Sequence, residues 1–578
     1  MKQTLSYLYS MKKFHLTLCV CMSIPLCAMS QSATDAYRLS QNDLRGTARF
    51  MSMAGAFGAL GGDLSCLSQN PGGIGIYRSN EVGITAGLDF MSNEAESRGI
   101  SSTTNQTVFN LNNLGGVFTL RMPSAMFPNI NIGFSYNKVA SFARRYNGGI
   151  PRLNTSLSNY IAGIANTWDL TEADVKSTGN FDPYNPPSGF RGAPWITILG
   201  YDSYLINPEG PVEDPHWYGQ FGNGTSGNGN FNVEEKGYVD EYNIAIGGNI
   251  NNIVFWGLDF GITSIDYRIG TVWGEELTDA YVYNPDAKRV QTMDARWSLS
   301  NDYKVSGTGY NFKMGVIVKP VQELRIGLAF HTPTYYSLTE NFYNEYVDFN
   351  YPFPNGSDYA VTNDGYPAAN NIDFQTPWRV IASVAGVIGS KFIISADYEW
   401  QGYKNMKYAN WTPDDYYWDP WWDYDYPWYY GTPSRAGSAA DSYDRDPIGF
   451  TNRKIKEIYR DSHTFRIGAE YRVLPGFSAR IGYSYTTSPI SASAKDNLVD
   501  IPGAGTMSDY RLDNETHHIT AGLGYKYRGF YADFAYVYKY QGSEYYPFSP
   551  DPDNEMSVAN SKLKLNTNQI VLSLGYKF

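Results

Sequence analysis

The chain has 578 residues and a net charge of −12 at pH 7, with 16% aromatic and only 18% charged residues. Soluble domains usually carry about 25% charged residues, so this composition argues against an ordinary cytosolic enzyme. The negative net charge argues against nucleic acid as a partner.

The first 30 residues have the pattern of a secretory signal peptide. A basic start at Met11–Lys13 precedes an apolar run, and a small-residue cleavage motif follows at Ala28–Ser30. We expect cleavage before Gln31 and interpret residues 1–10 as an upstream extension or a misassigned start. The protein is therefore expected to be exported.

Three of the four cysteines, Cys19, Cys21 and Cys27, lie in this leader. The mature chain would keep only Cys66, which excludes an internal disulfide. A lone cysteine in an apolar setting is usually a small core residue, and we expect Cys66 to be one.

A glycine-rich run follows at Gly55–Asp63 and Gln69–Gly75. Such a run suits backbone that packs tightly or turns where a Cβ would clash. It resembles the N-terminal plug, or hatch, of the FadL and TodX family of outer membrane transporters, which has a small-residue run, an acidic residue and an Asn-Pro-Ala-Gly signature here. This chain has Gly72 where the family has Ala. The resemblance implies that residues 31–80 form a plug and that its ligand-path residues are Gly61, Gly62, Asp63, Asn70, Pro71, Gly72 and Gly73.

From residue 81 onward, apolar residues alternate with glycine and polar residues. A strand that is apolar on one face and polar or small on the other is typical of a membrane β-barrel. The alternation predicts fourteen strands at 81–91, 107–122, 130–144, 237–250, 254–266, 297–318, 324–334, 377–387, 391–403, 463–473, 477–486, 517–527, 530–540 and 567–578.

The lengths of the connections support this interpretation. Connections after even-numbered strands are short, as at 251–253 and 528–529. Long connections follow odd-numbered strands, as outer membrane barrels require to separate periplasm from exterior. The long extracellular loops are predicted at 145–236, 335–376, 404–462, 487–516 and 541–566.

The last strand ends in an aromatic residue, Phe578. Many outer membrane barrels resemble this, and the barrel assembly machinery reads such a strand during insertion. No run of 18 apolar residues follows the leader, so no transmembrane helix is expected. The predicted fold is all-β: a fourteen-stranded antiparallel transmembrane barrel at 81–578, preceded by the plug.

The insertion at 145–236 contains one amphipathic helical pattern. Leu157, Ile161, Ile164 and Trp168 recur at helical spacing, whereas 176–232 is rich in Gly, Asn and Pro and is expected to be loop. In the family, helices at this position form a hydrophobic ligand groove, which the resemblance assigns to these four residues. The family also has an inward kink in the third strand that makes a side exit, and Gly133 would permit such a kink here.

No catalytic or metal site is predicted, and no cofactor. The histidines of the mature chain are interpreted as girdle or loop residues, and His517 and His518 are adjacent in a strand and so face opposite ways. Asp551, Asp553 and Glu555 resemble part of a calcium loop but lack its turn glycine and terminal glutamate, so a weak external Ca²⁺ site is only the alternative. The Trp-, Tyr- and Asp-rich loop at 411–432 is expected to be an irregular external cap whose rings pack on each other; stacking on sugars, cations or an apolar ligand is the alternative.

The resemblance implies a channel in the cell outer membrane for passive, TonB-independent uptake of hydrophobic, fatty acid-like or aromatic, molecules. Its partners would be that ligand, outer membrane lipids and lipopolysaccharide, and the barrel assembly machinery. One alternative is a FadL-like barrel that serves as a scaffold or shuttle for a protein secretion system. A surface lipase or deacylase is the weaker alternative, because it needs a Ser-His pair that no motif here supplies.

Overall fold

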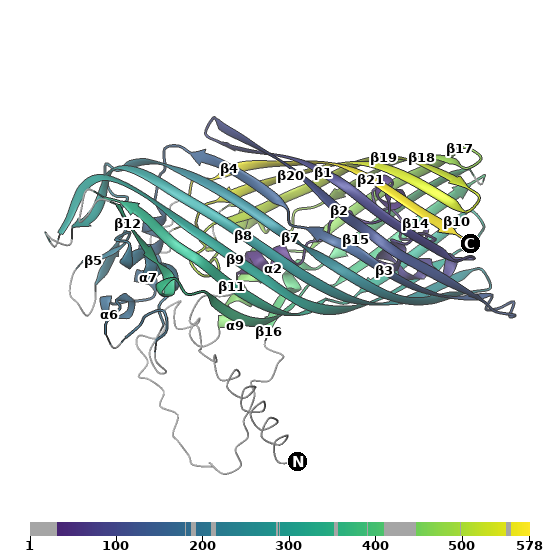
Figure 1. Ribbon diagram of the computed structural model, residues 1–578, viewed down its shortest axis with the longest axis horizontal. Helices are drawn as coiled ribbons and strands as arrows, with labels where there is room; N and C mark the ends of the chain where they lie inside the picture. The colour runs from purple at the N-terminus through teal and green to yellow at the C-terminus, as the bar shows by residue number, and fades with distance from the viewer. Residues whose placement is uncertain are drawn as a thin grey trace, which may run out of the picture.

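The computed structural model describes residues 32–179, 181–186, 192–209, 215–284, 287, 289–351, 357–389, 391–409, 447–496, 499–550 and 557–578. Fourteen antiparallel strands close into a barrel, because the first strand pairs with the last one as well as with the second. The barrel is long and lies horizontally in Figure 1, with the C-terminus at its right end. We call that end the base and the opposite end the mouth.

Each predicted strand range overlaps one strand of the ring, so the predicted fold class is confirmed. In ring order the strands are β1 (Glu81–Ser97), β2 (Ile100–Arg121), β3 (Asn129–Ser141), β7 (Ser226–Ile250), β8 (Val254–Asn284), β9 (Arg289–Val318), β10 (Leu324–His331), β14 (Arg379–Ile388), β15 (Phe392–Gln401), β17 (Ser462–Leu474), β18 (Phe477–Thr486), β19 (Tyr510–Tyr527), β20 (Phe530–Tyr546) and β21 (Ser561–Lys577).

The wall continues toward the mouth beyond the predicted strand ends. It is extended by β4 (Arg144–Ile150), β11 (Tyr335–Asn350), β12 (Ser357–Val361), β13 (Ala368–Gln375) and β16 (Lys407–Ala409). The region 335–376, predicted to be a long loop, is therefore mostly strand. Its alternation is the reverse of that in the membrane part of the wall, because Tyr336, Leu338 and Phe342 are buried in the apolar core of the mouth while Ser337 is exposed.

The outward face of the ring is apolar and the inward face is polar. On β7, for example, the exposed side chains Tyr242 and Ile244 alternate with the buried Glu241 and Asn243. Buried polar residues such as Asn131 line the interior of other strands. This alternation is the one that a lipid exterior and a filled lumen require.

Two bands of aromatic residues surround the outer wall. Near the mouth, the Tyr398 hydroxyl lies 2.8 Å from Nδ1 of His463, and the Tyr483 hydroxyl lies 2.9 Å from Nδ1 of His517. The exposed rings of the base band are Tyr471, Tyr525, Tyr527, Phe530 and Phe578. On β19 the two bands are eight residues apart, which at the usual rise and tilt of barrel strands spans about 20 Å along the axis. Such girdles mark the two edges of a membrane.

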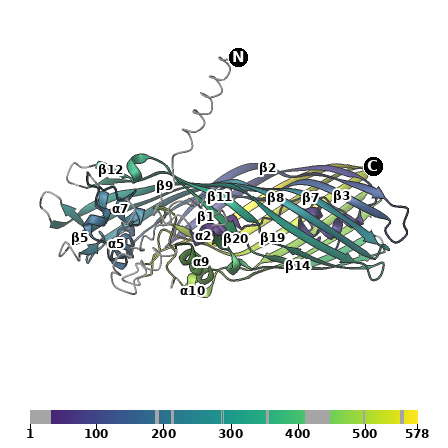
Figure 2. The same ribbon diagram turned by 90° about the horizontal axis from the view of Figure 1, so that it is seen from below.

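The mouth carries the helices and the short strands. The helices are α5 (Leu157–Thr167), α6 (Glu172–Val175), α7 (Trp195–Asp202), α9 (Pro447–Ile458) and α10 (Ala492–Lys495), with 3-10 turns η2 (Thr362–Gly365) and η3 (Tyr403–Asn405) and the pair β5 (Asn207–Glu209) and β6 (His216–Tyr218). Figure 2 shows β5, α5 and α7 gathered at this end. None of the described helices is long and apolar enough to cross a membrane.

Two predictions for the mouth have clear outcomes. The helix expected at Leu157 is α5. The prediction that 176–232 is loop is wrong in part, because it contains α7, β5, β6 and the start of β7. Trp195 of α7 and Trp217 of β6 are fully buried, so a small apolar core replaces the expected loop. The predicted signal peptide, the loop 411–432 and the acidic residues at 551–555 lie outside the described residues.

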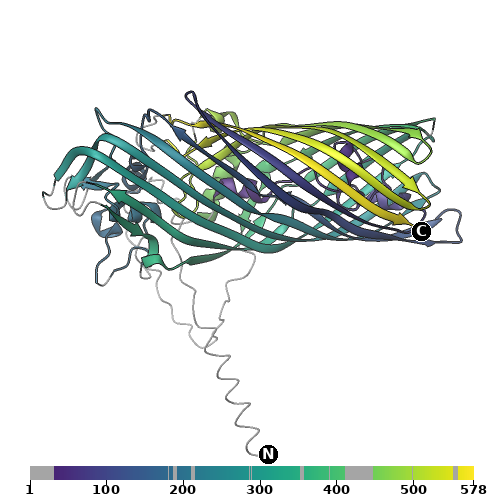
Figure 3. The ribbon, with the colours of Figure 1, turned by 45° about the horizontal axis from the view of Figure 1, so that its top comes forward.

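Residues 32–80, which we call the N-terminal segment, lie within the barrel (Figure 3). Their elements are α2 (Ala33–Leu39), α3 (Ala48–Ser52), α4 (Cys66–Gln69) and η1 (Pro71–Ile76). At the base the segment joins the ring directly, because Asn80 and Phe578 exchange two backbone hydrogen bonds of 3.0 and 3.1 Å.

Candidate functional site

The short helices of the N-terminal segment begin at side chains that suit helix starts. The hydroxyl of Thr47 accepts a hydrogen bond from the N–H of Phe50 at the start of α3. The amide oxygen of Asn70 accepts from the N–H of Gly72, and Pro71 occupies the first position of η1. Side-chain caps and an N-terminal proline stabilise helices too short to persist alone.

The segment approaches the wall so closely that glycine is needed on both sides. A Cβ on Gly58 would lie 1.9 Å from Oγ of Ser383, and a Cβ on Gly327 of β10 would lie 2.3 Å from the carbonyl oxygen of Gly58. A Cβ on Gly315 of β9 would lie 1.9 Å from Oδ1 of Asn70. The glycine-rich run therefore serves close packing against the wall, as its composition indicated.

Most of the residues that the resemblance singled out lie together in one tight knot. A Cβ on Gly61 would lie 2.7 Å from Cα of Gly73, and Gly62 donates from its N–H to the carbonyl of Gly73 at 3.2 Å. Asp63 accepts from the hydroxyl of Thr47 at 2.7 Å. Beside this knot, Asn70 also donates from Nδ2 to the carbonyl of Gly58 at 2.5 Å. The fold brings the seven residues together, and their role in a ligand path stays a prediction.

Polar side chains of the wall hold the backbone of the segment. Asn131 on β3 donates to the carbonyl of Ile74 at 2.6 Å, and Nε2 of His331 on β10 lies 2.8 Å from the carbonyl of Gln69. His331 and His518 are buried and face the interior, so the prediction that the histidines are girdle or loop residues is wrong for these two. His517 does face outward, opposite His518, as the alternation requires. Cys66 is buried and free, as expected.

Charged residues tie the segment to the wall along most of its length. Arg49 of α3 pairs with Glu470 on β17 at 2.9 Å. Asp43 pairs with Lys539 on β20 at 2.9 Å, and Arg45 pairs with Asp89 on β1 at 2.6 Å. Burial alone would raise the pKa of Asp43, but Lys539 and Arg45 outweigh burial and hold this pKa well below its usual range.

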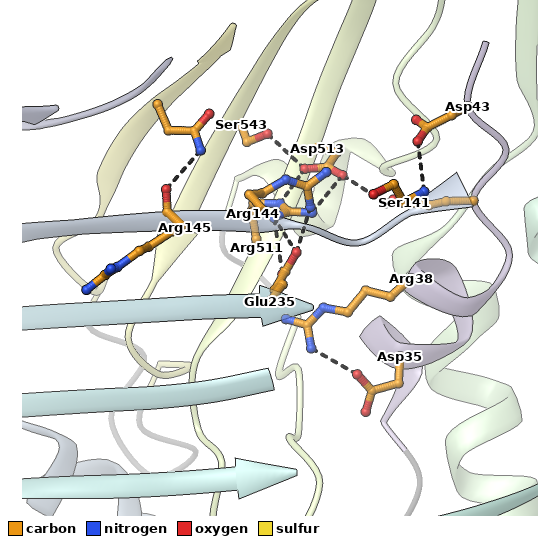
Figure 4. A network of polar contacts seen from close by, with 12 residues as sticks. Asp35, Arg38, Asp43, Ser141, Arg144, Arg145, Glu235, Arg511, Asp513 and Ser543 are labelled. Atoms are coloured by element: carbon orange, nitrogen blue, oxygen red, sulfur yellow. Dashed lines mark hydrogen bonds and ion pairs between the residues drawn. The ribbon is translucent and has the colours of Figure 1, made fainter. Parts of the chain in front are cut away.

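A second ionic network lies at the mouth end of the segment (Figure 4). Arg511 of β19 pairs with Asp513 at 2.7 Å and with Glu235 of β7 at 3.2 Å, and Arg144 of β4 also pairs with Glu235, at 2.8 Å. Beside them, Arg38 of α2 pairs with Asp35 at 2.9 Å. These six side chains carry three charges of each sign, so each buried ion has a partner of opposite sign.

A polar cavity of about 170 Å³ lies between the N-terminal segment and the wall. Its charged lining residues include Lys313, Arg379, Glu399 and Arg466. The sequence analysis did not single these out, although Lys313, Glu399 and Arg466 each stand between two apolar or aromatic residues of their strands. That position is the signal by which interior charges of a barrel could have been found.

The wall itself has a seam between β2 and β3. Among the described residues, β2 pairs with β3 only from Asn113 to Arg121, so the stretch Ile100–Asn112 has a partner strand only on its β1 side. Near the mouth, Oγ of Ser102 bonds Oδ1 of Asn147 on β4 at 2.6 Å and closes the seam again. The outward side chain of Phe109 is 67% exposed, which places this part of the seam at the height of the apolar band.

An apolar groove of about 1180 Å³ lies on the outer wall directly on the base side of this seam. Its walls belong to β1, β2, β3, β7 and β19–β21. The lining residues nearest the seam are Ile84, Leu114, Phe134, Tyr136 and Tyr242. The groove is floored by small residues, among them Gly115 and Gly116.

Gly133, predicted to permit a kink in the third strand, lies in a regular part of β3. Gly133 lies within uninterrupted pairing to Val117 on β2 and Ala245 on β7, and a Cβ there would lie 2.5 Å from Leu67 of the N-terminal segment. The irregular stretch of the third strand comes later, from a register shift at Lys138 to the start of β4 at Arg144.

The four residues predicted to form a ligand groove, Leu157, Ile161, Ile164 and Trp168, belong to α5 and its C-terminal end. Leu157, Ile161 and Trp168 are buried in the apolar core of the mouth, and Ile164 is partly buried. In this conformation they pack the mouth rather than line an open groove, and their part in ligand capture stays a prediction.

The family model described as outer membrane protein transport protein (OMPP1/FadL/TodX) matches residues 243–525, and the resemblance expected from the sequence is confirmed. No curated protein sequence matches this chain.

Several solved structures are similar to this chain. A FadL homologue from Pseudomonas aeruginosa has 10% identity and a TM-score of 0.46, with 93% of this chain and 99% of that chain covered. The toluene transporter TodX from P. putida has 11% identity and a TM-score of 0.44 over the same shares. The toluene transporter TbuX from Ralstonia pickettii has 13% identity and a TM-score of 0.40, again over 93% and 99%.

Proposed function

We propose that this chain, which resembles the outer membrane transport proteins of the FadL and TodX family, is an outer membrane channel for hydrophobic small molecules. The finer proposal is passive, TonB-independent uptake of fatty acid-like or aromatic molecules. It is supported by the family match over residues 243–525 and by the two aromatic girdles of the barrel.

The observation that carries this proposal is the seam at Ile100–Asn112 next to an apolar groove on the lipid-facing wall. A closed wall would confine a ligand to the lumen. A seam at the height of the apolar band offers a hydrophobic molecule a route sideways into the membrane, where its transfer from water is favourable. The groove would receive the molecule as it leaves the seam.

In this proposal the N-terminal segment is a plug. It fills the lumen at the base, where Gly58, Asn70 and Ile74 are hydrogen-bonded to the wall or to one another. Straight passage to the base would require these buried contacts to break together. Sideways exit above them requires fewer contacts to break, so we favour it over passage through the base.

The ligand would enter at the mouth and reach the polar cavity beside Lys313 and Arg379. Because this cavity is lined by charges and amides, it suits the polar end of an amphiphile better than a pure hydrocarbon. The apolar remainder of such a molecule would be directed toward the seam. We therefore favour amphiphiles with one polar end over simple aromatic hydrocarbons.

Mass spectrometry of molecules that co-purify with the protein from outer membranes, together with uptake by a deletion strain, tests this function. We expect an enriched amphiphile and slower uptake of that molecule without the protein. Recovery of bulk phospholipid alone, with normal uptake in the deletion strain, would reject transport. A stable protein partner in the same preparation would then favour the scaffold or shuttle role in a secretion system.

A further inference from the structure

Helix α9 continues the wall of the barrel beyond β16. The side chain of Asn452 bonds both backbone groups of Tyr408 in β16, because Oδ1 accepts from the N–H at 2.9 Å and Nδ2 donates to the carbonyl at 3.0 Å. At the end of α9, the carbonyl of Ile458 accepts from the N–H of Ser491, next to α10, at 2.8 Å. Figure 1 shows α9 and β16 along the lower edge of the barrel. The helix is thus joined to β16 on one side and to the start of α10 at its end.

The two faces of α9 differ in character. Ile455 and Ile458 are fully buried in the apolar core of the mouth. Arg453 and Lys456 are three residues apart, which places them on one face of the helix, and both are exposed. Arg460, just after the helix, is exposed as well. Because the apolar face fixes the helix against the core, the cationic face is directed away from the core.

Neighbouring elements add cations to this face. Lys404 of η3, Lys407 of β16 and Lys495 of α10 are also exposed. We call the six exposed cations the basic shelf: Lys404, Lys407, Arg453, Lys456, Arg460 and Lys495. With Lys454, these elements and the residues directly after them carry seven cations, against three carboxylates, Glu457, Asp461 and Asp496. The shelf is therefore locally positive in a chain whose net charge is −12.

Most cations of the basic shelf have no ionic partner. Within the described part of the chain, the one shelf cation that pairs with a carboxylate is Lys404, whose Nζ lies 3.3 Å from Oδ2 of Asp461. Glu457 pairs with Lys454, at 3.5 Å, rather than with a shelf residue. Exposed cations gathered without anions repel one another, so this arrangement favours an anion from outside the chain.

A second group of cations on the outer wall is neutralised. Lys236, Arg268 and Lys304 are cross-strand neighbours on β7, β8 and β9. Each pairs with a carboxylate of the same three strands. The partners are, in that order, Glu234, Asp302 and Asp266. The excess of positive charge is therefore a property of the basic shelf and does not extend to this other part of the wall.

The basic shelf lies at the height of the membrane headgroups. Arg460 comes three residues before His463 of the aromatic band near the mouth, and Lys404 comes four residues after Trp400, which pairs with His463. Four extended residues span at most about 14 Å. The headgroup layer begins at the aromatic band and is roughly 5–8 Å thick, and lysine and arginine side chains are long enough to reach back toward it.

We propose that the basic shelf binds the phosphate groups of the phosphorylated glycolipid of the outer leaflet, lipopolysaccharide. Such phosphates need counter-cations, and the shelf supplies them where the glycolipid meets the barrel. Arg453 and Arg460 can each bind a phosphate through two N–H groups, and the lysines add point charges. The bound glycolipid would hold α9, β16 and α10 at the surface of the membrane. This inference does not depend on what the barrel transports.

Native mass spectrometry of the purified protein in non-ionic detergent, titrated with lipid A, tests the site. The shelf variant is Lys407→Gln/Arg453→Gln/Lys456→Gln, which removes three exposed cations without a carboxylate partner in the described chain. The matched control, Lys236→Gln/Arg268→Gln/Lys304→Gln, removes three paired cations, so both variants lose the same net charge. A compact band that shifts on heating verifies that each variant is folded, and Lys407→Gln/Lys456→Gln replaces the triple shelf variant if that one fails.

We expect the shelf variant to bind lipid A at least about tenfold more weakly than the unmodified protein, because three cations next to an anionic headgroup are lost. The control should bind within about twofold of the unmodified protein, and dephosphorylated lipid A should bind all three proteins equally weakly. Equal affinity of the shelf variant and the unmodified protein would overturn the site. Equal weakening in the control would assign binding to net charge alone, and undiminished binding of dephosphorylated lipid A would assign it to apolar contacts; either result rejects the proposal.

Discussion

The carboxylate of Asp397 on β15 accepts a hydrogen bond of 2.9 Å from the backbone N–H of Gly58 in the N-terminal segment. The same Oδ2 accepts from the N–H of Phe57 at 3.0 Å. A buried wall carboxylate thus replaces the backbone partners that a segment without regular structure lacks. Contacts of this kind hold the segment in the lumen. Substitutions at the contacting residues test how closely the segment must approach the wall.

Replacement of Gly58 by alanine is expected to destabilise the protein. The new Cβ would lie 1.9 Å from Oγ of Ser383 and 3.1 Å from Oδ2 of Asp397, so the segment must move away from the wall. Overpacking of this kind costs about 1–3 kcal/mol. The midpoint of denaturant unfolding measures the effect. Gly386→Ala, where the new Cβ meets Ile394 at an ordinary 3.5 Å, is the control and should leave the midpoint nearly unchanged.

Asn70→Asp is expected to loosen the glycine-rich knot without unfolding the barrel. Nδ2 of Asn70 donates to the carbonyl of Gly58 at 2.5 Å, and Oδ1 accepts from Gly72 at 3.0 Å. Aspartate keeps the acceptor but loses the donor and turns a negative charge toward a carbonyl oxygen. Limited proteolysis should cut within residues 55–75 faster in the variant. Unchanged cleavage there would show that the knot does not depend on this amide.

The sequence predicted the ring because alternation survives wherever one face meets lipid and the other the lumen. It predicted tight packing or turns for the run at Gly55–Gly75, and both occur: Gly58 lies against the wall, and Gly55 and Gly61 have positive φ. It did not predict β11 and β13, because their alternation is the reverse of that of a membrane strand, with apolar residues such as Leu338 and Phe374 facing inward. It could not reveal the contacts of Asp43, because the partners of this residue, Ser141 and Lys539, are distant in the chain. The interior role of His331 was missed for the same reason, since its partner is a backbone carbonyl of another segment.

The mouth is expected to lose stability as the pH rises from about 4 to 6. Asp509, at the mouth just before β19, is 4% exposed, and burial raises the pKa of its carboxyl from 3.8 to about 6 in the folded protein. The folded state therefore binds the proton more tightly than the unfolded state does. The stabilisation is complete below about pH 4 and is lost as the pH rises through about 6, with a total of roughly 3 kcal/mol.

Asp509→Asn should weaken this dependence because asparagine does not titrate. Part of it should remain, because burial raises the pKa of Glu345 to about 7 and this carboxyl accepts from the N–H of Thr506 at 3.2 Å. Hydrogen exchange of residues 499–509 at pH 4.5 and 7, corrected for the intrinsic rates, measures it in both proteins. An unchanged slope in the variant would show that Asp509 does not contribute to the effect.

Lys313→Met is expected to destabilise the barrel strongly. Nζ of Lys313 lies 2.5 Å from Oε2 of Glu241 and 3.4 Å from Oδ2 of Asp259, and all three side chains are buried. Removal of the cation leaves two buried carboxyl groups close together, and breaking such a pair typically costs about 3–5 kcal/mol. The triple variant Lys313→Met/Glu241→Gln/Asp259→Asn is the control and should recover most of the loss in denaturant unfolding. Failure of the triple variant to recover would show that lost packing, not charge, dominates.

A covalent bridge across the seam is expected to block uptake. Ser102 on the β1–β2 hairpin and Asn147 on β4 hydrogen-bond through their side chains at 2.6 Å, at the mouth end of the seam. A disulfide between Ser102→Cys and Asn147→Cys would prevent the hairpin from moving away from β4, so the seam could not widen. Uptake of a fluorescent fatty acid into proteoliposomes should fall on oxidation and return on reduction. The only cysteine of the described chain, Cys66, is buried and should stay out of this exchange.

The matched control for this bridge is Thr464→Cys/Thr486→Cys. These two residues pair directly across β17 and β18, with their hydroxyl oxygens 3.0 Å apart, in a part of the wall without a seam. A disulfide there stiffens the barrel equally but leaves the side route free, so uptake should not change on oxidation. Equal inhibition in both variants would indicate that stiffening itself slows transport. An uptake rate that does not change when the disulfide between positions 102 and 147 forms would contradict exit through the seam. The ligand would then have to leave through the base, which requires the N-terminal segment to move as a whole.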